Sequence, residues 1–311
     1  MKKIKIRRKV KIPKKRKRLK YIAVLPSLVT LMNGICGFSA ILLASKGPGT
    51  ALNPSTLPSI NISFFAMAGF VIFIGMIADV LDGHVARISK STSSFGAQLD
   101  SLCDAISFGI APAFLMIKVI EYEMTKSPIS IEYPIFSLFY VRIIYLIAII
   151  YAVGAIIRLA RFNVEHKDAS HSKFAGLPTP AAAGTIISIV VFWEGFLPRI
   201  FVSQWSKPLW NTIEPFILWI LPLITLAAGI LMVSRIPYTH MMHRILKGKK
   251  SFSVFLLALF LLLLTIWSIQ FVMLTGFFGY TVFGIARAIH VKIKKPKKTL
   301  EANTEPSEDT Y

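Results

Sequence analysis

The segment Ile77–Pro112 reads IADVLDGHVARISKSTSSFGAQLDSLCDAISFGIAP, and it decides how the rest of the chain is interpreted. Four aspartates, Asp79, Asp82, Asp100 and Asp104, stand in it among apolar residues. Ionisable groups at membrane depth cost several kcal/mol each, so they usually face the interior of a helix bundle and take part in function. The segment therefore predicts a polar site between helices that cross a membrane.

The composition around this segment is that of an integral membrane protein. Of the 311 residues, 54% are apolar and 16% are charged, and the mean hydropathy is +0.63. Because about 20 helical residues cross a bilayer, we expect an all-α integral membrane protein and exclude an ordinary soluble domain. The apolar runs predict helices over 21–45, 63–88, 97–121, 136–162, 179–197, 214–234, 252–268 and 270–290. We expect the last two to form a tight hairpin, since the apolar stretch that they share is too long for one span.

The basic residues set the expected orientation. The net charge is +21, and thirteen Lys or Arg fall within residues 1–20. Cytoplasmic segments are enriched in Lys and Arg, so we predict a multi-pass protein of the cell membrane with both termini in the cytoplasm. The loops expected outside hold few basic residues, namely Lys46, Lys126, Arg199 and Lys207. We expect the basic N-terminal run to contact anionic membrane lipids and not nucleic acid.

The spacing of the aspartates places them on two helix faces. One face of the second predicted helix holds Asp79, Asp82, Gly83 and Ala86, and one face of the third holds Gly96, Asp100 and Asp104. A short loop on the cytoplasmic side joins these helices, so the two faces can pack against each other in antiparallel fashion. Four carboxylates would then converge in a small volume.

Such a cluster must be neutralised. Two like charges 4 Å apart repel by roughly 4 kcal/mol at an effective dielectric near 20, so either some aspartates are protonated or cations bind them. No set of Cys and His accompanies these oxygens, which favours Mg²⁺, Mn²⁺ or Ca²⁺ over zinc. Gly83 and Gly96 leave room for a bulky ligand, although helix packing also explains them. Arg87 offers a planar fork that pairs with phosphate.

The fixed positions of this segment form a family signature. The pattern Asp79-x2-Asp82-Gly83-x2-Ala86-Arg87-x8-Gly96-x3-Asp100-x3-Asp104 matches D-x2-D-G-x2-A-R-x8-G-x3-D-x3-D throughout. Eight fixed residues would essentially never coincide by chance, and the chain is therefore similar to the CDP-alcohol phosphatidyltransferases. The resemblance implies a six-helix core, here followed by the C-terminal two-helix hairpin, and displacement of CMP from a CDP-linked lipid by an alcohol.

The resemblance also implies a role for each matching position. Asp79, Asp82 and Asp100 would bind two divalent ions, Mg²⁺ or Mn²⁺. Asp104 would approach the second ion and act as the base that takes the proton of the alcohol hydroxyl. The residues that would bind CDP are Asp82, Gly83, Ala86 and Arg87.

Further segments resemble the branch of the family that uses serine and makes phosphatidylserine. They are Leu25–Gly34, Arg158–Val164, Phe174–Gly184 and Leu231–Tyr238, and the chain departs from the usual branch pattern at Ser27 and Arg235. The resemblance implies CDP-diacylglycerol and L-serine as substrates. Arg158 and Arg161 stand three residues apart near the inner end of a span, and an arginine fork binds a carboxylate bidentately. We therefore expect one of them to hold the serine carboxylate, although interfacial anchoring also explains arginines there.

On this basis the chain divides into four parts. They are a basic cytoplasmic segment (1–20), a CDP-alcohol phosphatidyltransferase transmembrane domain (21–240), a transmembrane hairpin (241–290) and a disordered tail (291–311). The sequence leaves open the same chemistry with glycerol 3-phosphate, inositol phosphate or choline, and it leaves open a homodimer. A cation transporter is the alternative from another class, but transporters often contain internal repeats, and this acidic cluster occurs once.

Overall fold

The computed structural model describes residues 24–49, 62–89, 94–127, 132–165, 176–195, 215–234 and 268–294, together with 197, 212–213, 236, 259 and 263–265. The side chains of 24–26, 85–89, 94, 165, 288–289 and 291–294 lie outside this description. The helices are α2 (Val24–Ser45), α3 (Phe64–Ser89), α4 (Ser94–Asp104), η1 (Ala105–Ile110), α5 (Ala111–Lys126), α7 (Pro134–Glu165), α8 (Thr179–Gly195), α11 (Phe216–Val233) and α14 (Ile269–Lys294).

This architecture confirms the prediction of an all-α integral membrane protein. Six helical stretches of the described chain are long and apolar enough to cross a bilayer: Ser27–Ser45, Phe64–His84, Phe95–Lys126, Pro134–Val164, Phe216–Val233 and Ile269–Arg287. Their ends lie within six residues of the predicted ones. Of the predicted hairpin, α14 is described as a helix, whereas 252–268 lies mostly outside the described residues, as do 1–20 and 295–311.

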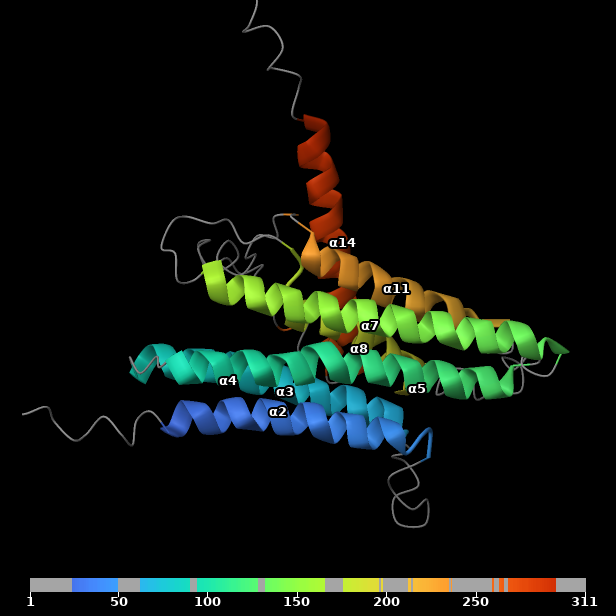
Figure 1. Cartoon of the computed structure of the whole chain (residues 1–311), viewed down its shortest axis with the longest axis horizontal. Coiled ribbons are helices and arrows are strands. Elements are labelled where there is room, and N and C mark those ends of the chain that lie inside the picture. Colours follow the sequence, from blue (N-terminus) through green and yellow to red (C-terminus); the bar gives the residue numbers. More distant parts are fainter. Residues whose placement is uncertain are drawn as a thin grey trace, which may run out of the picture.

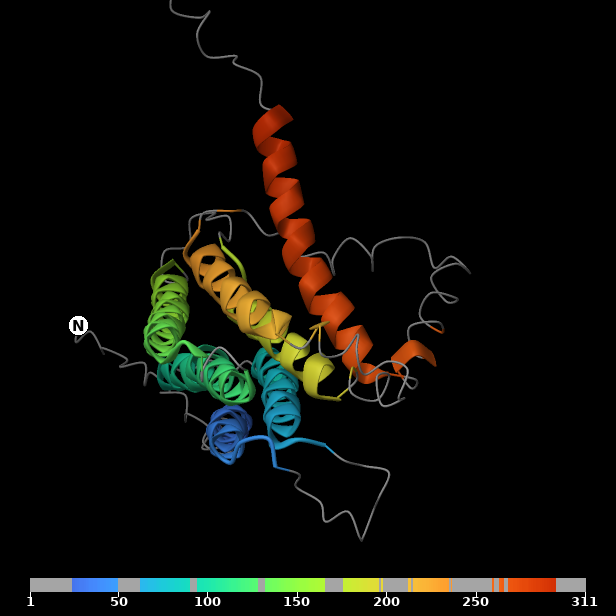
Figure 2. The ribbon, with the colours of Figure 1, turned by 90° about the vertical axis from the view of Figure 1, so that its right-hand side faces the viewer.

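The long helices run side by side along one axis, with one exception (Figure 1). Helices α2, α3, α5, α7 and α11 follow the axis of the bundle, and α4 continues through η1 into α5. Helix α14 instead crosses the bundle steeply, which is clearest when the bundle is viewed along its axis (Figure 2). The sequence predicted a helix at this position but carried no signal for its direction.

Helix α8 occupies the middle of the bundle. Nearly all of its residues are buried, including the continuous run from Ala182 to Val191, as expected for a helix that is apolar on every side. Helix α14 packs directly on it: Thr185 and Thr281 share a buried hydrogen bond of 2.9 Å, and the ring of Phe277 lies where a side chain at Gly184 would stand. The glycine therefore permits the close crossing of the two helices.

The third span contains a turn of π-helix that the sequence analysis did not predict. Segment η1 joins α4 to α5 without a break, and Pro112 follows it at the second position of α5. Proline has no N–H to donate to the carbonyl four residues earlier, which is that of Phe108. The hydroxyl of Tyr151 on α7 donates to this carbonyl at 2.8 Å. The local change of helix type thus has an identifiable cause.

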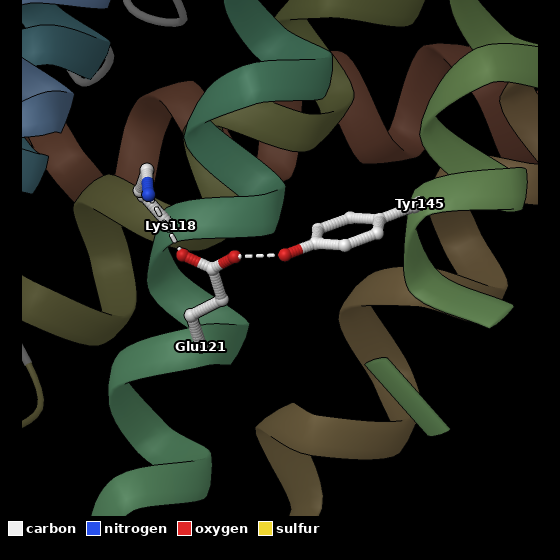
Figure 3. Close-up of polar contacts among 3 residues, drawn as sticks. All are labelled: Lys118, Glu121 and Tyr145. Carbon is white, nitrogen blue, oxygen red and sulfur yellow. Dashed lines mark hydrogen bonds and ion pairs between the residues drawn. The ribbon is translucent and has the colours of Figure 1, made fainter. Parts of the chain in front are cut away.

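A polar contact joins α5 and α7 beyond this turn (Figure 3). Lys118 Nζ lies 2.8 Å from Glu121 Oε2, and the Tyr145 hydroxyl donates to Glu121 Oε1 at 2.6 Å. All three side chains are partly exposed on the surface of the bundle. Because each polar group meets another, the charges are tolerated on a surface that is otherwise apolar.

Gly37 sets the distance between α2 and η1. A methyl group added at Gly37 would lie 2.4 Å from Ser107 Oγ and 2.6 Å from Ser107 Cα. We predict that Gly37→Ala lowers the thermal denaturation midpoint in detergent, with a loss of about 1–3 kcal/mol of stability, because overpacking forces the backbones apart.

Gly276→Ala on α14 is the matched control, since no described atom lies within 4 Å of a methyl group there. Alanine favours a helix over glycine by roughly 0.5–1 kcal/mol, so this variant should melt at or above the wild-type temperature. Equal melting of the two variants would contradict the close approach at Gly37.

Candidate active site

The candidate site is built by the last turns of α3 and by α4. Helix α3 is apolar over most of its length and becomes polar from Asp79 onward, while α4 is the most polar of the described helices. Asp79 and Asp82 stand three residues apart on α3, and Asp100 and Asp104 stand one turn apart on α4. The end of α3 and the start of α4 lie at the same end of the bundle (Figure 1).

Three of the four aspartates come together. Asp79, Asp100 and Asp104 each offer a carboxylate oxygen, and these oxygens all lie within 4.8 Å of one another. Asp104 is buried, and Asp79 and Asp100 are partly buried. Asp82 is also buried and lies beside this set, but its carboxylate accepts a hydrogen bond from the Thr30 hydroxyl on α2.

No basic side chain in the described part of the chain forms an ion pair with these carboxylates. The ion pairs found there, Lys118–Glu121 and Lys126–Glu123, both lie on α5. Unit charges 4.8 Å apart repel by roughly 3 kcal/mol at an effective dielectric near 20. The set consists of oxygen ligands alone, which suits a hard divalent cation such as Mg²⁺ or Mn²⁺.

Helix α2 contributes two polar residues that the sequence analysis did not assign to the site. Asn33 Nδ2 donates to Asp104 Oδ1 at 2.8 Å, and Thr30 donates to Asp82. Thr30 and Asn33 are both buried within an apolar helix. Two polar residues three apart in an apolar run are a signal of a polar neighbour, but their partners lie 52 and 71 residues away in sequence.

Arg158, near the end of α7, stands close to the carboxylates. Its charge interacts with that of Asp104, and its Nη1 donates to the Thr179 hydroxyl at 2.8 Å. Its Nε is buried and meets no hydrogen-bond partner among the described residues. Arg161, one turn further, is partly buried. Of the two arginines expected to hold an acceptor carboxylate, Arg158 therefore has the clearer connection to the acidic set.

The structure describes only some of the remaining predicted site residues. Gly83 is exposed, and a methyl group built on it would meet no described atom within 4 Å, so helix packing does not explain this glycine. Ala86 and Arg87 belong to the last turn of α3, but their side chains lie outside the described part, and Arg235 lies outside it altogether. Asn163 on α7 exchanges hydrogen bonds with Ser101, which lies on α4 between the two aspartates.

Comparisons with known proteins identify the family of the chain. Residues 23–212, more than half of the chain, match the family model described as CDP-alcohol phosphatidyltransferase. The CDP-diacylglycerol–serine O-phosphatidyltransferase of Helicobacter pylori (strain ATCC 700392 / 26695) is 31% identical over 241 residues, which cover 74% of this chain and 83% of that protein.

Proteins with the same name in other organisms are also similar to this chain. The Mycobacterium bovis protein is 30% identical over 196 residues, covering 61% of this chain and 57% of its own length. The Saccharomyces cerevisiae protein is 30% identical over 168 residues, covering 52% and 51%. The motif resemblance noted in the sequence is thus confirmed by independent comparisons, and the chain belongs to the CDP-alcohol phosphatidyltransferase family.

Proposed function

We propose that this protein transfers the phosphatidyl group from CDP-diacylglycerol to L-serine, giving phosphatidylserine and CMP. The observation that carries the proposal is the convergence of Asp79, Asp100 and Asp104 at one end of an apolar helix bundle. Membership of the family supports phosphatidyl transfer from a CDP-linked lipid. The names of the relatives support serine as the acceptor.

We infer that two divalent ions, Mg²⁺ or Mn²⁺, are held by Asp79, Asp82 and Asp100, with Asp104 beside the second. The donor chemistry fits, because the clustered side chains offer carboxylate oxygens and no sulfur or imidazole. When bound, such ions offset the charge of the diphosphate and stabilise CMP as it leaves.

The reacting bonds involve the serine hydroxyl and the phosphorus atom that carries diacylglycerol. The hydroxyl oxygen forms a bond to this phosphorus, the bond from phosphorus to the oxygen of CMP breaks, and CMP leaves with the electron pair. Asp104 accepts the hydroxyl proton in this proposal. Asn33 occupies one oxygen of Asp104, at 2.8 Å, which leaves the other oxygen to face the acceptor. General-base catalysis of this kind contributes about 10²–10⁴-fold in rate.

The CDP group would lie along the exposed last turns of α3. Gly83 is open on the side where a side chain would project, so the helix backbone is accessible to a ligand there. The family pattern places Asp82, Ala86 and Arg87 on the same stretch, and we propose that they complete the CDP site. The guanidinium of Arg87 would pair with the diphosphate.

Arg158 is our choice for the residue that binds the serine carboxylate. Thr179 holds Nη1 at 2.8 Å, which fixes the guanidinium on the side of α8. The buried Nε has no described partner, and a buried donor without a partner costs about 1–3 kcal/mol. A carboxylate that accepts from Nε and the second terminal nitrogen would remove this cost. In this scheme Arg161 contacts lipid or diphosphate oxygens.

We further propose that the site faces the cytoplasm at the inner surface of the cell membrane. The acidic set lies at the end of the bundle where α3 ends and α4 begins, and the basic residues of the sequence favour this end as cytoplasmic. The water-soluble acceptor would then reach the site from the cytoplasm, while the lipid substrate stays in the inner leaflet.

The reaction itself is the first test. Purified protein in mixed micelles should release CMP from CDP-diacylglycerol when serine and Mg²⁺ or Mn²⁺ are present, and EDTA should abolish release. Radiolabelled serine should appear in lipid in equal amount. If glycerol 3-phosphate or inositol phosphate supports CMP release and serine does not, the acceptor assignment is wrong.

Asp104→Asn tests the base. The substitution keeps the size of the side chain but removes the proton-accepting carboxylate, so we expect turnover to fall about 10²-fold or more with CDP-lipid binding largely retained. Turnover should be followed as CMP release and binding by calorimetry. The matched control is Glu121→Gln. Glu121 belongs to the same continuous helical span, but it contacts Tyr145 and not the acidic cluster, so this variant should keep wild-type turnover. Normal turnover in Asp104→Asn would remove Asp104 as the base.

Arg158→Lys tests the carboxylate contact. Lysine keeps the charge but loses the bidentate fork, and the loss of a charged hydrogen bond corresponds to about a tenfold or larger rise in the KM for serine. The KM for CDP-diacylglycerol should change little. Arg142→Lys, on an exposed part of the same helix, serves as control. If Arg161→Lys raises the KM for serine and Arg158→Lys does not, the two arginines exchange roles.

A further inference from the structure

Thr30 and Asn33 form a polar pair on the inner face of α2. They stand three residues apart, so they project from the same side of the helix. Their exposed fractions are 3% and 0%, although the rest of this face consists of small and apolar residues. A buried hydroxyl or amide in an apolar span is costly unless it is hydrogen-bonded, so the partners of this pair explain its presence.

The two partners are aspartates from two different helices. Thr30 donates to Asp82 on α3, and Asn33 Nδ2 donates to Asp104 Oδ1 on α4 at 2.8 Å. One face of α2 therefore contacts both halves of the acidic cluster. A rotation or shift of α2 would disturb both contacts at once.

The position of Asn33 is itself tightly determined. Its backbone carbonyl accepts a hydrogen bond of 2.7 Å from Ser107 Oγ in the π-helical turn. A methyl group at Gly75 on α3 would lie 3.1 Å from Asn33 Oδ1, so α3 approaches closely on the other side. The amide oxygen has no hydrogen-bond partner among the described residues. Among the described residues, the Asn33 side chain therefore makes its hydrogen bond to Asp104.

We propose that Thr30 and Asn33 are positioning residues that fix the carboxylates of Asp82 and Asp104. Each donates to one carboxylate oxygen and so restricts the rotation of the carboxylate plane, which would leave the second oxygen available to a bound ion or to substrate. This inference rests on the proposed function of the acidic cluster. Thr30 and Asn33 would be hydrogen-bond partners of the metal ligands. Removing such a partner commonly changes metal affinity or activity about 10–100-fold.

The sharpest test compares two substitutions at Thr30. Thr30→Val keeps the shape and removes the donor, whereas Thr30→Ser keeps the donor. Thr225→Val on α11 is the matched control, because Thr225 is fully buried and its hydroxyl donates to the Leu221 carbonyl of its own helix. Asn33→Leu removes the second donor at similar volume. For each variant, Mn²⁺ binding is followed by electron paramagnetic resonance without substrate, and kcat and KM are measured by CMP release.

We expect Thr30→Val and Asn33→Leu to lower kcat or weaken Mn²⁺ binding by about 10–100-fold, with the KM for CDP-diacylglycerol within about threefold of wild type. Thr30→Ser and Thr225→Val should behave like the wild type. If Thr30→Val and Thr30→Ser give the same kcat and the same Mn²⁺ affinity, the hydrogen bond to Asp82 has no positioning role and the proposal is overturned. This comparison remains decisive if Asn33→Leu does not fold.

The test of the positioning role can be distinguished from the test of the proposed reaction. Mn²⁺ binding is measured without any acceptor, so it reports on the positioning residues even if serine proves not to be the substrate. Failure of serine in the wild type would overturn the acceptor assignment alone. Wild-type Mn²⁺ affinity and CMP release in both Thr30→Val and Asn33→Leu would overturn the positioning role alone.

Discussion

The structure depends on one electrostatic constraint, which is the mutual repulsion of carboxylates held close together at the end of an apolar bundle. Three carboxylate oxygens lie within 4.8 Å of one another and form no ion pair with a basic side chain in the described part of the chain. Their mutual repulsion is unfavourable unless cations bind or protons neutralise the charges. A protein that folds in this way gains nothing in stability from the cluster. The divalent ions and the phosphate-bearing substrate that we propose would offset this repulsion.

Close helix packing is what makes this arrangement possible. Helix α2 approaches the π-helical turn at Gly37, where a larger residue would collide with Ser107, and α3 at Gly75, where a larger residue would crowd Asn33. The approach brings Thr30 and Asn33 within hydrogen-bonding distance of Asp82 and Asp104. On the other side, Thr179 at the start of the buried helix α8 holds Arg158. The site therefore joins residues of α2, α3, α4, α7 and α8, and the packing of the bundle fixes their geometry.

Much of this could be predicted from the sequence, because composition and spacing are local signals. The apolar runs gave nearly all helix ends, and the i, i+3 and i, i+4 spacing identified the helix faces that carry the aspartates. Tertiary features could not be predicted. The π-helical turn precedes Pro112, and the Phe108 carbonyl within it accepts a hydrogen bond from Tyr151 of another helix. The roles of Thr30 and Asn33 depend on partners 52 and 71 residues away, and the crossing direction of α14 is set by its contacts with α8.

The central claim, that the aspartates converge in order to bind divalent ions, is tested most directly by anomalous diffraction. Crystals grown with CDP-diacylglycerol and Mn²⁺ would be measured near the manganese absorption edge. Our account predicts anomalous density in direct contact with the carboxylates of Asp79, Asp100 and Asp104. Density located away from these side chains, or none at Mn²⁺ concentrations that saturate CMP release, would contradict it.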